Sequence, residues 1–202
     1  ISPYIANFFN NVTIDNGATL NTGGSIAYNT VVYGTVTNYG TITGSGDFIV
    51  HGPGLINNSS INPSSLKFNS ACNISGAGTF TSANILIDTA GSVTLSSSVT
   101  FSPATKMEIN NGGILKPNAF TFTFNSGAFY CFSGGTVLAG GLFRTQNTVT
   151  LNIRTGSAFN SALNVNTGTT TAGEFSSPYN GRFYGNLTIE NGATLSTNNS
   201  SA

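Results

Sequence analysis

The chain of 202 residues repeats its own beginning at its end. Residues 2–27 and 177–202 align at a constant offset of 175 without a gap, and 15 of the 26 positions are identical. Both segments begin Ser-Pro-Tyr, and both contain Asn-Gly-Ala-Thr-Leu. A biased composition could produce one of these motifs by chance, but it does not explain both at the same offset. A period of this kind is typical of proteins in which similar units stack on one another.

The repeat divides the chain into two parts. Residues 1–176 hold one full unit, and residues 177–202 form the start of the next unit. No linker and no separate domain interrupts the unit. The sequence begins without Met and without a signal segment. We therefore expect the chain to belong to a longer tandem array.

The composition favours strands and turns. The chain contains 27 Asn, 28 Thr and 25 Gly, whereas charged residues make up only 6%. Asn and Gly tolerate the left-handed backbone of tight turns, and Thr favours strands. Residues that favour helices are scarce, and no segment keeps a helical period. The sequence therefore predicts an all-β protein.

A short motif recurs inside the unit. Two apolar residues separated by one position are followed by a Gly three positions later and, in most copies, by another apolar residue. The motif occupies 12–20, 107–115, 122–130, 151–159, 163–168 and 187–195, with a longer variant at 85–91. Alternation places both apolar side chains on one face of a strand, and the Gly then turns the chain. A single turn cannot bury this face, but stacked turns share one core.

The motif therefore predicts a right-handed parallel β-solenoid with about seven to nine coils per 175-residue unit, at about 4.8 Å per coil. A β-sandwich built from hairpins is the alternative, because Asn-Gly also favours hairpin turns.

Segments 185–196 (GNLTIENGATLS) and 34–54 (GTVTNYGTITGSGDFIVHGPG) resemble the β-solenoid repeats of giant secreted surface proteins. Such proteins are exported by a type IX route in gliding bacteria that have an outer membrane, and autotransporter passengers are similar. The resemblance implies an extracellular, cell-surface location. Together with the tandem unit, it predicts the shaft of a filament or a giant adhesin that acts in attachment, gliding or capture of other cells.

The residue types that carry catalysis are sparse. The one histidine, His51, lies in a turn-rich segment. The six acids are scattered, at Asp15, Asp47, Asp88, Glu108, Glu174 and Glu190. We expect no enzyme activity, no metal site and no cofactor. A carbohydrate-binding or carbohydrate-processing β-helix stays open as the alternative function, on fold analogy alone.

Charge and hydrophobicity exclude other partners. The six basic residues balance the six acidic ones, whereas nucleic acids bind clustered Lys and Arg. No apolar run reaches the length of a transmembrane helix. We expect that the chain does not bind nucleic acid and does not span a membrane. The predicted partners are copies of the chain itself, with cell-surface glycans or a host or prey surface as further targets.

Threonines and cysteines raise two narrower questions. Thr-x-Thr pairs begin at residues 35, 41, 79, 121 and 148. An ice-binding face needs such pairs once per coil on one side, and this spacing is irregular, so ice binding is a remote alternative. Cys72 and Cys131 lie two to three predicted coils apart, which favours two buried thiols over a disulfide.

Aromatic residues suggest a surface for self-association. Adjacent residues of a strand point to opposite faces, so runs of neighbouring rings cannot all be buried. The candidate lateral interface comprises Phe8, Phe9, Phe129, Tyr130, Phe132, Phe183 and Tyr184. Asp88-Thr89-Ala90 resembles the O-glycosylation signal of the same group of bacteria, which makes Thr89 a candidate modification site.

Overall fold

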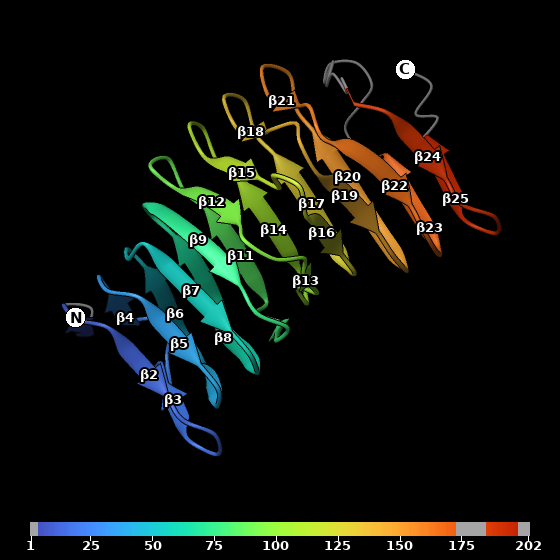
Figure 1. The fold of residues 1–202 in the computed structure, drawn as a ribbon. Helices are drawn as coiled ribbons and strands as arrows, with labels where there is room; N and C mark the ends of the chain where they lie inside the picture. Colours follow the sequence, from blue (N-terminus) through green and yellow to red (C-terminus); the bar gives the residue numbers. More distant parts are fainter. Residues whose placement is uncertain (1–3, 173–184, 198–202) are drawn as a thin grey trace.

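The computed structural model describes residues 4–172 and 185–197, which form a parallel β-solenoid of about nine turns (Figure 1). The described residues contain 25 strands and no helix. Each described strand pairing is parallel and joins strands of successive turns. The prediction of an all-β parallel solenoid is confirmed. The hairpin sandwich is excluded, because it requires antiparallel pairs.

Each complete turn contributes one strand to each of three columns that run along the solenoid axis, named here columns A, B and C. Columns A and C belong to the 17-stranded sheet, and column B is the 8-stranded sheet. Columns A and C are joined into one sheet because β6 (Thr41–Val50) and β8 (Ser60–Phe68) each pass from column C into column A.

The remaining strands are assigned by their pairing. Column A also contains β1 (Tyr4–Phe8), β4 (Tyr28–Val32), β11 (Asn84–Ile87), β14 (Lys106–Ile109), β17 (Gly127–Cys131), β20 (Thr148–Ile153), β23 (Thr169–Ala172) and β25 (Thr194–Thr197). Column B contains β2 (Val12–Ile14), β5 (Val36–Asn38), β7 (Gly54–Asn57), β9 (Ala71–Ser75), β12 (Ser92–Leu95), β15 (Ile114–Lys116), β18 (Thr136–Val137) and β21 (Ala158–Phe159). Column C also contains β3 (Thr19–Asn21), β10 (Thr79–Phe80), β13 (Val99–Phe101), β16 (Thr121–Phe124), β19 (Leu142–Thr145), β22 (Ala162–Val165) and β24 (Leu187–Ile189).

The glycine of the recurring motif turns the chain from one column to the next. Gly17, Gly112 and Gly192 have φ values of 79°, 81° and 80°, which glycine adopts at little cost. Next to the first of these, the Ala18 amide donates a hydrogen bond of 2.9 Å to the Asp15 carbonyl. The Asn-Gly sequences therefore form corners within one coil, and they do not form hairpins.

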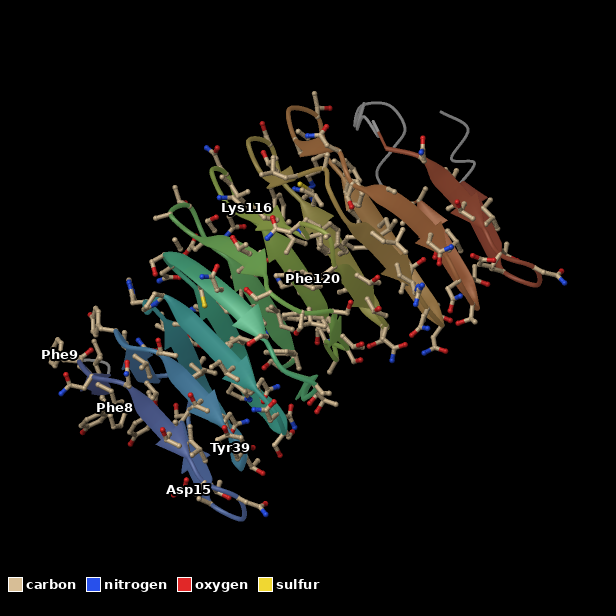
Figure 2. The ribbon with its side chains drawn as sticks, viewed as in Figure 1. Phe8, Phe9, Asp15, Tyr39, Lys116 and Phe120 are labelled. Atoms are coloured by element: carbon tan, nitrogen blue, oxygen red, sulfur yellow. The ribbon has the colours of Figure 1, made fainter. Side chains whose placement is uncertain are left out.

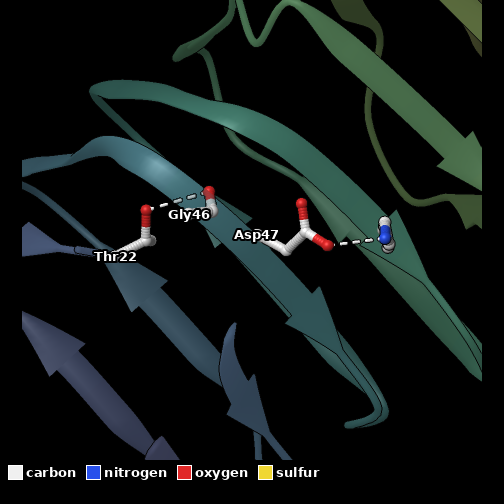
Figure 3. A network of polar contacts seen from close by, with 4 residues as sticks. Thr22, Gly46 and Asp47 are labelled. Carbon is white, nitrogen blue, oxygen red and sulfur yellow. Dashed lines mark hydrogen bonds and ion pairs between the residues drawn. The ribbon is translucent and has the colours of Figure 1, made fainter. Parts of the chain in front are cut away.

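The passage of β6 between two columns depends on two further glycines, Gly44 and Gly46, of which Figure 3 shows Gly46. The register of β6 against β8 shifts between Gly44 and Asp47, and Gly44 has a φ of 128°. The Thr22 hydroxyl donates a hydrogen bond of 3.1 Å to the Gly46 carbonyl. A Cβ at Gly46 would lie 2.2 Å from the Thr22 carbonyl oxygen, so any larger residue would push the two coils apart.

The core is one continuous stack of apolar side chains inside the three columns. In its later turns the stack is aromatic. The rings of Phe80, Phe101, Phe122 and Phe143 follow one another with centroid distances of 4.4, 5.1 and 5.0 Å. Because each coil adds a ring to the same stack, the apolar face of one turn is covered by the next.

Two buried amides stack at the corner between columns B and C. Asn38 and Asn57 are fully buried, and the Asn38 side-chain amide donates a hydrogen bond of 2.8 Å to the Asn57 side-chain oxygen. The Asn57 side-chain amide donates to the Thr79 carbonyl at 3.0 Å. These bonds link three successive coils, and a buried amide needs such partners to offset its loss of hydration.

Candidate functional site

Three aromatic side chains stack at the corner between columns A and B. Phe9, Tyr33 and His51 each come directly after a column A strand, in three successive coils. The ring centroids of Phe9 and Tyr33 lie 5.1 Å apart, and those of Tyr33 and His51 lie 5.2 Å apart. The coils are held in this alignment by backbone bonds, such as the 2.8 Å bond from the His51 amide to the Val32 carbonyl. We call these three residues the corner stack.

Two rings of the corner stack are exposed at the N-terminal end of the solenoid. Phe9 is 73% exposed and Tyr33 is 43% exposed. At the other end of β1 and β4, Tyr4 stacks on Tyr28 with ring centroids 5.1 Å apart, and Ile5 is also exposed. Figure 2 shows Phe9 at this end of the molecule, projecting from the ribbon. Clustered exposed apolar side chains mark interaction surfaces more often than single ones do.

The structure corrects two residues of the predicted lateral interface. Phe129 is fully buried in the core, where its ring meets that of Phe143 at 4.9 Å in an edge-to-face contact. It therefore cannot contribute to a lateral surface. Phe8 pairs with Val32, which in turn pairs with Val50, and both of these valines are fully buried. Phe8 thus continues a core row, and it is 38% exposed because no described coil precedes β1.

Tyr130 on β17 and Phe132, at the corner between columns A and B directly after it, form a second, more covered aromatic site. Both are half-buried, and their ring centroids lie 5.7 Å apart. The Arg154 guanidinium lies 4.4 Å from the centre of the Phe132 ring, within the range of a cation–π contact. Of the five predicted interface residues that the structure describes, Phe9 is the most exposed. Phe183 and Tyr184 lie outside the described residues.

A row of hydroxyl groups runs along column C. Each member of the row is the register partner of the next one in the neighbouring strand. The members are Thr19, Thr41, Ser60, Thr79, Thr100 and Thr123. Successive members lie 19 to 23 residues apart, because the corners differ in length. The Thr residues are irregularly spaced in the sequence, which argued against an ice-binding face. In the structure, hydroxyl residues nevertheless align in one row along column C, and the sequence alone did not predict this row.

Four of the described charged side chains lie on the outer face of column A. Lys67 forms an ion pair of 2.6 Å with Asp47, and Lys106 forms one of 2.7 Å with Glu108. All four side chains line one shallow depression. Asp47 and Glu108 belong to coils three turns apart, which corresponds to about 14 Å. This separation exceeds the 5 to 10 Å, approximately, between the two carboxyl groups of glycoside hydrolases.

The remaining acids have separate positions. Asp88 accepts hydrogen bonds from the Thr89 amide at 2.9 Å and from the Asn110 side chain at 3.2 Å. Glu190 accepts a bond of 2.7 Å from the Asn164 side chain, and Glu174 lies outside the described residues. Within residues 4–172 and 185–197, no three His, Cys, Asp or Glu side chains are grouped so that they could hold a metal ion. The same residues include no helix that could cross a membrane.

The two cysteines are separate buried thiols, as predicted. Both are free, and they lie on β9 and β17 in different columns. Burial raises the pKa of Cys72 to about 12. Burial also raises the pKa of Cys131 to about 12, against the opposing effect of a hydrogen bond with Ser157. Neutral thiols are poor nucleophiles and poor metal ligands, so both act as small apolar core residues.

The candidate modification site lies on the surface. Thr89 and Ala90 are exposed in the corner between β11 and β12. With His51, Asn69 and Asp88 they line a shallow depression beside the corner stack. His51 lies in the turn-rich segment expected from the sequence, but its contact with Tyr33 was not predicted. The contact could have been predicted from position, since each member of the corner stack follows the last apolar residue of its strand.

Comparison with known proteins finds no family model, no curated protein and no solved structure that matches this chain.

Proposed function

We propose that the chain is part of the structural shaft of an extracellular filament or giant cell-surface adhesin, built from tandem copies of the 175-residue unit. In such a shaft the unit supplies length and stiffness, and attachment or capture is performed by surfaces that the shaft carries. Every coil holds its neighbours by strand pairing and by a shared core, so units add without linkers.

The observation that carries this proposal is the continuity of the strands across the unit boundary. β24 belongs to the second copy of the repeat, and it pairs in register with β22 of the first, with Leu187 opposite Leu163 and Ile189 opposite Val165. β25 pairs with β23 in the same way. Leu187 and Ile189 are each 48% exposed, as expected where a further coil would cover them.

Lateral association of parallel copies is part of the proposal. The chain carries no net charge and only 12 charged side chains, so repulsion between copies is weak. Phe9 and Tyr33 offer an exposed apolar contact that each unit would repeat. A weak contact repeated along two shafts adds through multivalency, and rotational symmetry would close several shafts into a bundle.

Electron microscopy of the native protein, isolated from the cells that make it, tests the proposal. We expect a rod that lengthens by about 40 Å for each unit in the gene. Antibodies against this chain should label intact cells, whereas an antibody against a cytoplasmic protein should label only permeabilised cells. A compact particle, or labelling that requires permeabilisation, would contradict the proposal.

A further inference from the structure

The second copy of the repeat lies in different columns from the first. β2 (Val12–Ile14) lies in column B and pairs with β5. Its counterpart in the second copy, β24 (Leu187–Ile189), lies in column C and pairs with β22. The next strand shows the same change, since β3 lies in column C beside β6 and its counterpart β25 lies in column A beside β23. Both strands have moved by one column in the same direction.

The local structure of the repeat is unchanged by this move. The Ala18 amide donates to the Asp15 carbonyl at 2.9 Å, and the Ala193 amide donates to the Glu190 carbonyl at 3.0 Å. The corner glycine between them keeps its backbone conformation, with φ values of 79° and 80° in the two copies. The same strand–corner–strand piece therefore occurs twice, and the second copy is displaced along the axis and rotated about it.

We infer that one unit comprises eight full turns and one further column, so that each unit in the array is rotated by a third of a turn relative to the unit before it. Column C contains nine described strands from β3 to β24. Since successive strands of a column are one turn apart, β24 lies eight turns after β3. Because β2 lies one column before β3, the path from β2 to its counterpart β24 is eight turns and one column, which is eight and a third turns. This inference rests on the proposed tandem shaft, and it concerns how consecutive units join.

The inference assigns a partner to the open N-terminal edge. In the array, β2 and β3 of one unit dock on β22 and β23 of the preceding copy, as β24 and β25 do in this chain. Val12 then lies over Leu163 of that copy, and Ile14 lies over Val165, by analogy with the observed pairing. Asp15 takes the place of Glu190, which accepts a hydrogen bond of 2.7 Å from the Asn164 side chain. Asp15 keeps the negative charge of this position, so its carboxylate can accept the same bond.

The rotation distributes surface features around the shaft. The corner stack of Phe9, Tyr33 and His51 would face a new side in each unit, and it would return to its first side after three units, or about 120 Å. Two straight shafts could therefore share this contact only at every third unit. Shafts that coil around each other could share it at every unit, so the rotation favours a twisted bundle.

Engineered disulfides in the 202-residue chain test the rotation. A disulfide requires Cα atoms within about 7 Å, which neighbouring strands about 4.8 Å apart satisfy. The pair Asn164→Cys/Thr188→Cys joins β22 to β24, and Thr171→Cys/Ser196→Cys joins β23 to β25. The control pair Asn160→Cys/Thr188→Cys would lie close only if β24 continued column B, after β21. The native thiols are buried, and peptide mapping identifies each bridge.

We expect both test pairs to bridge on mild oxidation and the control pair to stay reduced. Bridging of the control pair in place of the test pairs would show a whole number of turns per unit and would overturn the inference. Failure of all three pairs would overturn it as well, because β24 and β25 would then not dock on the assigned strands. The proposed shaft is judged separately, by the rod or compact particle seen in the microscope.

Discussion

The first two coils and the later coils use aromatic residues in opposite ways. Between Tyr4 and Tyr39, six aromatic rings are exposed at the surface, among them Phe9 and Tyr33. Between Phe80 and Phe159, seven phenylalanines are fully buried and stack through the core. In the first region the rings lie at corners, on outward positions or on the open end, whereas in the second they occupy inward positions of columns A, B and C.

The role of a ring follows its position within its coil and also its chemistry, since four of the six exposed rings are tyrosines and all seven buried rings are phenylalanines. An inward ring gains about 1.5 to 3 kcal/mol from burial, so later coils that carry rings there are held firmly. A ring at a corner gains little free energy from burial within one chain. The first region is therefore less stabilised by its aromatic residues, and those residues remain available for contacts with another molecule.

Truncation of a core ring should give the largest effect. Phe143 is fully buried and contacts Phe122, Phe129 and Phe159 with centroid distances of 5.0, 4.9 and 5.1 Å. We expect Phe143→Ala to lower the free energy of unfolding by about 3–5 kcal/mol, measured by denaturant titration. A loss below about 1 kcal/mol would mean that the later core is loosely packed, and the contrast between the two regions would disappear.

The thiol within the aromatic core should make stability depend on pH. Burial raises the pKa of Cys131 to about 12 from an ordinary value of 9.0. Above pH 9 the unfolded chain ionises this thiol and the folded chain does not, so stability falls as the pH rises from 9 towards 12. In a Cys72→Ala background, the free energy of unfolding should drop by about 1.4 kcal/mol more between pH 8 and pH 10 than in the Cys72→Ala/Cys131→Ala control. Equal pH dependence in the two variants would indicate a core that water reaches.

Truncation of a corner ring should give the smallest effect on stability. Phe9 is 73% exposed, so Phe9→Ala should change the free energy of unfolding by less than about 0.5 kcal/mol. The same variant should weaken self-association in sedimentation velocity runs at high protein concentration. Phe143→Ala serves as the matched control, since it removes an equal ring from the core. If Phe9→Ala destabilises the fold and leaves association unchanged, the corner stack belongs to the core and has no lateral role.

The fold could be predicted from the sequence because its signals are local. Val12 and Ile14 alternate, Gly17 turns the chain, and Leu20 follows, and this pattern specifies two strands and a corner without knowledge of the rest. The repeat at an offset of 175 then indicates stacking. The same motif supplied no information on the column in which each strand lies. That assignment depends on the summed lengths of all the corners between the two copies.

The candidate surface was less predictable for a related reason. Period-2 alternation correctly implies that Phe129 and Tyr130 point to opposite faces, but it does not say which face is inside. Phe9, Tyr33 and His51 are 24 and 18 residues apart, and only the pairing of β1, β4 and β6 brings them together. The hydroxyl row of column C stayed hidden for the same reason. Contacts between coils depend on register, and unequal corners remove the regular spacing that would reveal it.

The parallel stacking has a mechanical consequence for a shaft that is pulled from its ends. The backbone hydrogen bonds between coils lie along the axis, so tension loads the bonds of one interface directly and peels a terminal coil before it disturbs the interior. A coil of about 20 residues advances the shaft by about 4.8 Å when folded, but it can extend to about 70 Å when unravelled. Each lost coil would thus release length and dissipate work while the remaining coils stay folded. A shaft of this design would yield gradually from its open edges, and the aromatic stretch between Phe80 and Phe159 would be the last to unravel.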